Sequence, residues 1–125
     1  MPIELTAEHL KQIRKHGEAT YPHECCGLLL GHVIAGEKQV AETYAAQNTS
    51  EEGAQHNRFL IPPDAVREAE QYARKQKLEI VGFYHSHPDA PSKPSQYDLD
   101  HAWPHVWYVI VSVEQGEPKL MTVWR

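Results

Sequence analysis

The chain has 125 residues, of which 41% are hydrophobic and 23% are charged, and it carries a formal net charge of −5. This length suffices to bury a core without disulfides, and we expect a single domain covering residues 1–125. The acidic balance argues against nucleic-acid binding through a broad basic surface.

The beginning of the chain lacks a basic segment followed by an apolar one, and no stretch approaches the ~20 apolar residues that span a bilayer. We therefore expect a cytoplasmic protein with no membrane partner. Cys25 and Cys26 are adjacent and have no third partner, so they form neither a disulfide framework nor a C-x-x-C zinc pair. They are typical of small residues in an apolar strand, in a reducing compartment.

The first half of the chain predicts one helix followed by two strands. Thr6 is a good N-cap for a helix over residues 7–19, which ends before Pro22 because the residue preceding a proline avoids the α region. The nearly continuous apolar run over residues 25–31 indicates a strand buried on both faces, which Val33 and Ile34 continue toward a turn, and residues 39–46 indicate a second strand. The apolar stripe of the helix consists of Leu10, Ile13 and Gly17.

The second half predicts a helix, a strand, a short helix and two further strands. The first of these helices opens at Pro62-Pro63-Asp64, because a proline at the first helical position already has a helical φ. The expected segments are a polar loop over 48–54, a short strand over 58–61, a helix from 63 to about 77, a strand over 79–87, a Pro-rich loop over 88–94, a short helix over 95–102 and strands over 106–113 and 120–124.

This order of elements predicts an α/β or α+β domain with one central sheet sandwiched by helices. Active sites in such domains tend to lie beyond the ends of strands. The apolar run over residues 80–84 leads directly into His85-Ser86-His87, so this strand end is the candidate site.

His85 and His87 stand one residue apart at the end of that strand. Side chains at i and i+2 of a strand point to the same face, roughly 6.5–7 Å apart along it. At that separation two imidazoles can converge on one metal ion with bonds of about 2.0–2.1 Å. The alternative is two ordinary polar residues at a strand exit, but burying both without partners would cost on the order of a kcal/mol each. A metal would remove that cost.

A third ligand has two candidates, Asp98 and His101. Asp98 ends a Ser95-x-x-Asp98 pattern, which is also an N-terminal helix cap in which the carboxylate reaches back to the backbone. His101 lies about one helical turn later and shares the face of Asp98. Periodicity does not separate the two. Two histidines, one carboxylate and a water would make an open zinc site of the catalytic kind.

Hydrolysis at such a site also needs a general base beside the water, and Glu24 is the candidate because it stands directly before a buried strand. Without the histidine pair, Glu24 would be interpreted as a solvated charge at a strand start. Ser95 would donate its hydroxyl to the oxyanion that forms when water attacks a carbonyl.

Together these residues resemble the signature of the JAMM (MPN-plus) metallopeptidases, in their stand-alone prokaryotic form. The pattern covers nearly the whole chain, with Glu24 in Pro-x-Glu-x-x-Gly, then His-Ser-His-Pro from His85, then Ser95-x-x-Asp98. The resemblance implies one zinc ion per chain held by His85, His87 and Asp98. It also implies Glu24 as general acid and base, Ser95 as stabiliser of the tetrahedral intermediate, and a cytidine-deaminase-like α/β/α sandwich with one central mixed sheet.

Members of this family hydrolyse peptide or isopeptide bonds after the C-terminal Gly-Gly of ubiquitin or ubiquitin-like proteins. The short connections of this chain resemble prokaryotic members that trim or release ubiquitin-like sulfur-carrier proteins, so the resemblance implies such a carrier as substrate. Residues 48–61 correspond to the segment that lines the groove for the substrate tail in relatives.

The main alternative is a non-catalytic MPN-type module that keeps the fold for protein contacts, although such relatives typically lack the ligand set. A cysteine hydrolase is disfavoured, because an apolar strand interior is a poor place for a thiolate. His23, beside Glu24, is a weak candidate for tuning the site. Surface or packing roles are expected for His9, His16, His32, His56 and His105.

Overall fold

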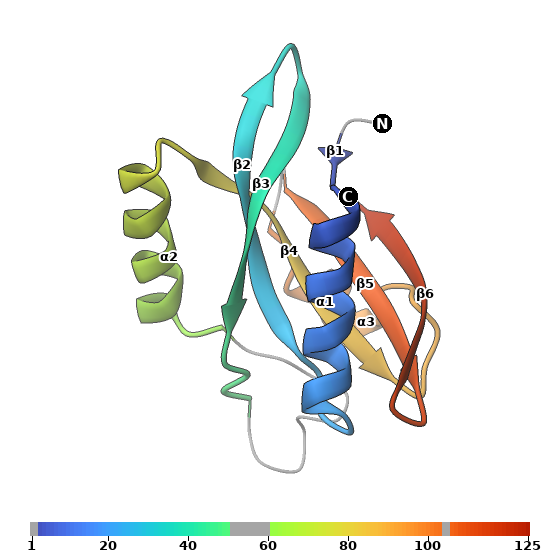
Figure 1. Ribbon diagram of the computed structural model, residues 1–125. Helices are drawn as coiled ribbons and strands as arrows, with labels where there is room; N and C mark the ends of the chain where they lie inside the picture. Colours follow the sequence, from blue (N-terminus) through green and yellow to red (C-terminus); the bar gives the residue numbers. More distant parts are fainter. Residues whose placement is uncertain (1–2, 51–60, 104–105) are drawn as a thin grey trace.

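The computed structural model describes residues 3–50, 61–103 and 106–125 (Figure 1). In these ranges no helix is long and apolar enough to cross a membrane. Residues 58–60 of the predicted short strand lie outside the described residues, as do residues 51–54 of the predicted loop, His56 and His105. The elements are β1 (Ile3–Glu4), α1 (Ala7–Thr20), β2 (Cys26–Ile34), β3 (Glu37–Ala46), α2 (Pro63–Lys75), β4 (Glu79–Pro88), α3 (Gln96–Asp100), β5 (Trp107–Glu114) and β6 (Glu117–Trp124).

The other predicted helices and strands are confirmed with differences at their ends, and the structure has one further strand, β1. β1 was not predicted, because two residues are too few for a periodic pattern. β6 begins three residues before the predicted start at Leu120, since Gln115 and Gly116 adopt positive φ values of 48° and 85° and close a tight hairpin from β5. The second helix ends at Lys75 rather than near Lys77, whose φ of 61° is left-handed.

The strands form one curled mixed sheet in the order β1-β3-β2-β4-β5-β6 (Figure 1). β1 with β3 and β4 with β5 pair in parallel, whereas the remaining neighbours are antiparallel. β2 lies inside the sheet, and its residues from Cys26 to Gly31 are all buried, as the apolar run predicts. The parallel pairing of β4 with β5 requires a crossover connection, and α3 lies in that connection.

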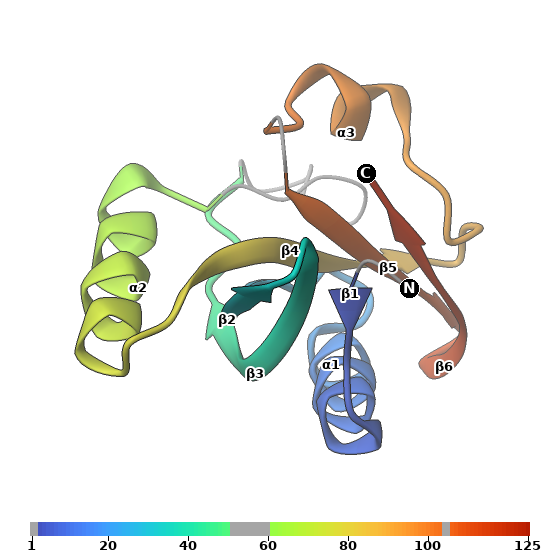
Figure 2. The same cartoon turned by 90° about the horizontal axis from the view of Figure 1, so that it is seen from above.

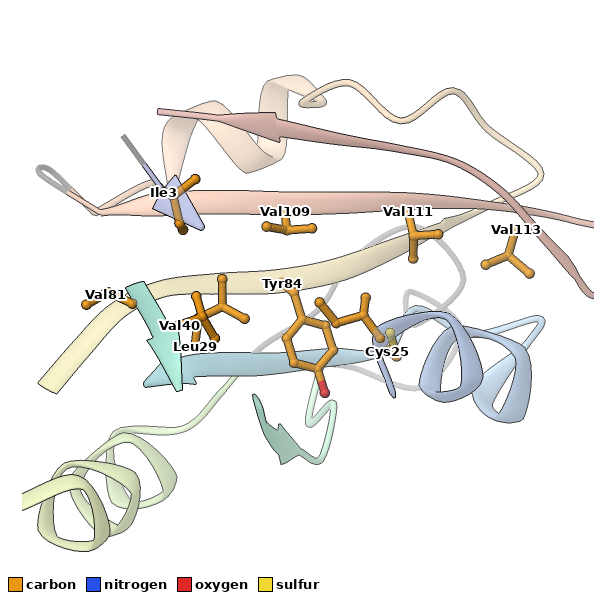
Figure 3. Close-up of a cluster of buried hydrophobic side chains, with 10 residues drawn as sticks. Ile3, Cys25, Leu29, Val40, Val81, Tyr84, Val109, Val111 and Val113 are labelled. Carbon is orange, nitrogen blue, oxygen red and sulfur yellow. The ribbon is translucent and has the colours of Figure 1, made fainter. Parts of the chain in front are cut away.

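Helices cover both faces of the sheet, with α1 on one side and α2 and α3 toward the other (Figure 2). Two separate hydrophobic clusters fill the two interfaces. The cluster beneath α1 contains Ile3, Ile13, Cys25, Leu29, Val40, Val81, Tyr84, Val109, Val111 and Val113 (Figure 3). The cluster beneath α2 contains Leu28, Leu30, Ala69, Ala73 and Phe83.

The buried face of α1 differs from the predicted stripe in one residue. Ile13 and Gly17 are buried as predicted, but the third buried residue is His9, and Leu10 is only half-buried. His9 tolerates burial because its polar atoms are satisfied: Nδ1 accepts the Thr6 N–H at 3.1 Å, and Nε2 lies 3.0 Å from the Ala41 carbonyl oxygen. The predicted cap at Thr6 is confirmed, since its hydroxyl accepts the His9 N–H at 3.2 Å.

The two cysteines have the packing role that the sequence predicts. Both thiols are free and buried. Burial raises the pKa of Cys25 and of Cys26 to about 12. Because the thiolate is the nucleophilic form, neither residue suits a cysteine hydrolase.

Candidate metal centre

The end of β4 brings two buried imidazoles together. His85 is 1% exposed and His87 is 6% exposed. Their Nε2 atoms lie 3.1 Å apart, so the i, i+2 spacing on the strand directs both rings to one point. Complete burial lowers the pKa of His85, which favours the neutral imidazole that binds metals.

Asp98, in the first turn of α3, joins the histidines. Its Oδ2 lies 3.2 Å from His85 Nε2 and 3.0 Å from His87 Nε2. The same residue takes part in the helix cap, because Ser95 N–H donates to Oδ2 at 2.9 Å and Ser95 Oγ accepts the Asp98 N–H at 3.1 Å. The two interpretations of Ser95-x-x-Asp98 are therefore compatible, since one carboxylate serves both arrangements. Burial alone would raise the pKa of Asp98, but the hydrogen bonds to His85 and His87 outweigh it and hold the pKa well below its usual range.

These three side chains fit a zinc ion. His85 Nε2, His87 Nε2 and Asp98 Oδ2 lie 3.0–3.2 Å from one another. Zinc bonds of about 2.0–2.1 Å at tetrahedral angles separate neighbouring ligand atoms by about 3.3–3.4 Å. Two imidazoles and one carboxylate at this spacing also match the ligand number of catalytic rather than structural zinc sites.

A backbone contact fixes the orientation of one imidazole. His87 Nδ1 lies 2.8 Å from the Pro91 carbonyl oxygen, which can only accept a hydrogen bond. Nδ1 therefore donates this hydrogen bond, and Nε2 is the ring nitrogen that faces Asp98. Such an outer partner is typical of metal-binding histidines.

Glu24 lies two residues before β2, the strand next to β4, and reaches the same place. β2 and β4 are antiparallel with Cys26 opposite His85, and the register carries Glu24 toward His87. Two further bonds fix this approach: Ser86 N–H donates to the Cys25 carbonyl oxygen at 3.2 Å, and Cys25 N–H donates to Ser86 Oγ at 2.8 Å. The ligand atoms of Glu24, His85 and His87 all lie within 4.8 Å of one another.

The environment of Glu24 is unusual for a carboxylate. Glu24 is 3% exposed, and its Oε1 has no hydrogen-bond partner among the described residues. Burial raises its pKa to about 9, and the nearby charge of Asp98 contributes to the shift. Because burial without a partner costs free energy, such a carboxyl is more typical of a functional site than of a structural one.

His101, the rival third ligand, contacts Tyr97 rather than the two histidines. Its side chain is exposed, and Nδ1 lies 2.9 Å from the Tyr97 carbonyl oxygen of its own helical turn. Its ring stacks on that of Tyr97 at a centroid distance of 4.0 Å. The structure therefore groups Asp98, and not His101, with the two histidines.

An apolar cavity of about 200 Å³ opens beside these residues. The sequence analysis did not predict its aromatic wall, in which the Trp103 ring meets the Phe83 ring edge-on at a centroid distance of 5.0 Å. The backbone N–H of Trp103 donates to the Tyr108 hydroxyl at 2.7 Å. The aromatic content after Asp98 is the one sequence signal for it. The cavity is lined by Ile61, Val66, Phe83, His85, Tyr97, Asp98, His101, Trp103 and Tyr108.

The chain matches the family described as prokaryotic homologs of the JAB domain over residues 6–125. This match extends well beyond half of the chain and includes all the predicted site residues. The chain belongs to the prokaryotic JAB family. This result agrees with the resemblance to stand-alone JAMM proteins that the motif predicts.

Curated relatives of this JAB chain carry several names. It is 35% identical over 86 residues to the tail tip assembly protein K of Escherichia phage N15, covering 69% of this chain and 30% of the relative. It is 32% identical over 98 residues to a desampylase of Pyrococcus furiosus, covering 77% of this chain and 64% of that protein. A probable TtuB-protein conjugate cleaving protease of Thermus thermophilus is 29% identical over 105 residues, covering 84% and 66%. The chain thus spans less than two thirds of the length of the phage protein and of the Pyrococcus desampylase.

Solved structures agree with the fold. A solution structure of a protein from Salinibacter ruber is 44% identical, with a TM-score of 0.74, and the match covers 99% of this chain and 80% of that one. A JAB1/MPN domain protein from Archaeoglobus fulgidus is 19% identical with a TM-score of 0.59, covering 94% and 83%, and supports the fold alone.

Proposed function

We propose that this JAB chain is a zinc-dependent peptidase that cleaves the peptide or isopeptide bond after the C-terminal Gly-Gly of a ubiquitin-like or sulfur-carrier protein. The observation that carries the proposal is the convergence of His85, His87 and Asp98 at 3.0–3.2 Å, with the buried carboxyl of Glu24 beside them. The chain would act as a single catalytic domain. The helices on both faces of its sheet are consistent with a cytidine-deaminase-like sandwich.

In this proposal His85, His87 and Asp98 hold one zinc ion. The bound ion would lower the pKa of a water molecule to about 7 and polarise the substrate carbonyl. The protein contributes a preformed set of ligands, since burial keeps His85 neutral and the Pro91 carbonyl orients His87. Preformed ligands reduce the ordering cost of binding the ion.

Glu24 moves the proton. Burial raises its pKa to about 9, and a bound cation beside it would favour the ionised form. Glu24 then takes a proton from the attacking water and delivers it to the departing amine, which makes it base first and acid second. The absence of a hydrogen-bond partner for Oε1 among the described residues leaves that oxygen available for this transfer.

Ser95 stabilises negative charge on the attacked carbonyl. Its Oγ already accepts the Asp98 N–H, so the hydroxyl hydrogen remains free to donate to an oxyanion. Ser95 is half-buried, which allows contact with substrate. The apolar cavity next to His85 and Asp98 would receive the tail of the substrate. The similarity to the Pyrococcus desampylase and to the probable conjugate cleaving protease of Thermus supports an activity of this kind.

The decisive experiment uses a ubiquitin-like carrier ending in Gly-Gly, fused to a short C-terminal peptide and, in parallel, conjugated to a lysine side chain. We expect one zinc per chain by elemental analysis, and intact-mass spectrometry should show the carrier cut after Gly-Gly. Cleavage should cease with a chelator and return with added zinc. Zinc-loaded protein that binds carriers without cutting any of them would instead support the non-catalytic MPN-type module.

A further inference from the structure

The helix that carries Asp98 has little packing of its own. α3 has five residues, and none of them is buried. Packing of an apolar face normally provides most of the stability of a protein helix. The position of Asp98 relative to His85 and His87 therefore depends on how the chain is held at the two ends of α3.

The Pro-rich loop between β4 and α3 is held by side chains of the sheet. Ser112 Oγ on β5 donates to the Ala90 carbonyl oxygen at 2.7 Å. His87 Nδ1 on β4 donates to the next carbonyl, that of Pro91, at 2.8 Å. The carbonyl after that, of Ser92, accepts bonds from β6. Three consecutive carbonyls of the loop are thus satisfied by three neighbouring strands.

The bonds from β6 converge on one oxygen. The hydroxyl of Thr122 donates to the Ser92 carbonyl oxygen, and Trp124 Nε1 lies 3.1 Å from the same oxygen. Trp124 Nε1 also lies 2.7 Å from Thr122 Oγ1, so the two side chains support each other. Ser92 is 5% exposed, and a buried carbonyl left without a donor costs about 1–3 kcal/mol.

Ser92 lies only three residues before Ser95, whose N–H holds Asp98 Oδ2 at 2.9 Å. A loop anchored at Ser92 has little freedom to move Ser95, and through Ser95 it fixes the carboxylate against the two imidazoles. If the anchor is removed, this segment becomes ordered only when the metal binds, and the loss of conformational entropy then weakens metal binding.

We propose that Thr122 and Trp124 are positioning residues of the metal centre, which act from the C-terminal strand through the Ser92 carbonyl. The inference rests on the proposed function and adds to it two residues outside the JAMM motif. Their hydrogen bonds go to the Ser92 carbonyl oxygen and to each other, so they act on the metal ligands indirectly.

The test compares Thr122→Val, which removes the hydroxyl and keeps the shape, with Thr122→Ser, which restores the hydroxyl. Zinc affinity is measured by competition with a chromophoric chelator, and thermal unfolding is measured on metal-free protein. We expect zinc affinity to fall on the order of tenfold in Thr122→Val and to recover in Thr122→Ser. Thr43→Val is the matched control, because Thr43 Oγ1 donates at 2.7 Å to Gln12 on α1, away from the loop.

A second readout does not require metal. In metal-free Thr122→Val, the amide hydrogens of Ser95 and Asp98 should exchange faster than in wild type, and in Thr122→Ser they should not. Trp124→Phe removes the N–H donor and keeps a smaller aromatic ring, so it provides a second comparison if Thr122→Val fails to fold. If the variants lost thermal stability while zinc affinity and amide hydrogen exchange stayed unchanged, both residues would have only a structural role and the inference would be overturned. Wild-type protein without zinc affinity would overturn the proposed metal centre itself.

Discussion

The buried carboxyl of Glu24 links charge to stability, and Glu24→Gln tests this link. The unfolded chain titrates Glu24 near 4.5, whereas the folded, metal-free protein titrates it at about 9. Between these values the folded state holds a proton that the unfolded state has released, so the free energy of unfolding falls as pH rises. Each pH unit above the unfolded pKa lowers the free energy of unfolding by about 1.4 kcal/mol, so at about pH 7 it is lower by on the order of 3 kcal/mol.

Glutamine has a similar shape and does not titrate. Metal-free Glu24→Gln should therefore gain on the order of 3 kcal/mol relative to wild type between about pH 4.5 and about pH 7. Urea unfolding at several pH values measures this change, and the change with pH is more informative than the absolute difference because the amide introduces its own donor. Glu18→Gln, which removes an exposed carboxylate on α1, controls for the altered net charge.

The same variant tests the proposed role in catalysis. Zinc-loaded Glu24→Gln should retain its metal and lose about 10²–10⁴-fold in cleavage rate, the usual contribution of a general acid–base group. If the free energy of unfolding changed with pH in the same way in wild type and variant, Glu24 would be charged or solvated in the folded protein. Cleavage at the wild-type rate would exclude Glu24 as the base.

Three further predictions concern other parts of the molecule. Asp98→Ala should weaken zinc binding by more than about 100-fold, whereas His101→Ala should change it little, and the reverse order in chelator competition would make His101 the ligand. Asp89 accepts hydrogen bonds from a turn N–H and a tyrosine hydroxyl, which lower its pKa from 3.8, so it stabilises the fold above that pH and loses this effect on acidification. Asp89→Asn, tolerated at a φ of 54°, should lower the thermal midpoint near neutral pH and not near about pH 3, and an equal loss at both would contradict this account. Gly27→Ala would place Cβ 2.2 Å from the buried Tyr84 ring and should cost about 1–3 kcal/mol, whereas an unchanged midpoint by calorimetry would show that the ring can move.

Local patterns predicted most of the fold. The cap at Thr6, the proline that opens α2 and the apolar run of β2 each depend on neighbouring residues alone, and each is confirmed. The buried place of His9 could not be predicted in this way. Its burial depends on the Ala41 carbonyl oxygen, which comes from a strand that the helix meets only in the folded chain.

At the candidate site, too, local sequence predicted some features and tertiary contacts determined others. The spacing of His85 and His87 on one strand was sufficient to predict that both imidazoles face one point, because alternation along a strand is a property of the backbone. Periodicity alone did not separate Asp98 in α3 from His101 at its C-terminal cap, and only the family resemblance favoured Asp98 from the sequence. The tertiary structure adds the positions of both side chains. The path of the Pro-rich loop brings Asp98 Oδ2 within 3.0–3.2 Å of both imidazoles and leaves His101 exposed. The anchoring of that loop by Thr122 and Trp124 had no sequence signal, because it joins residues 30 and 32 positions apart through a single carbonyl oxygen.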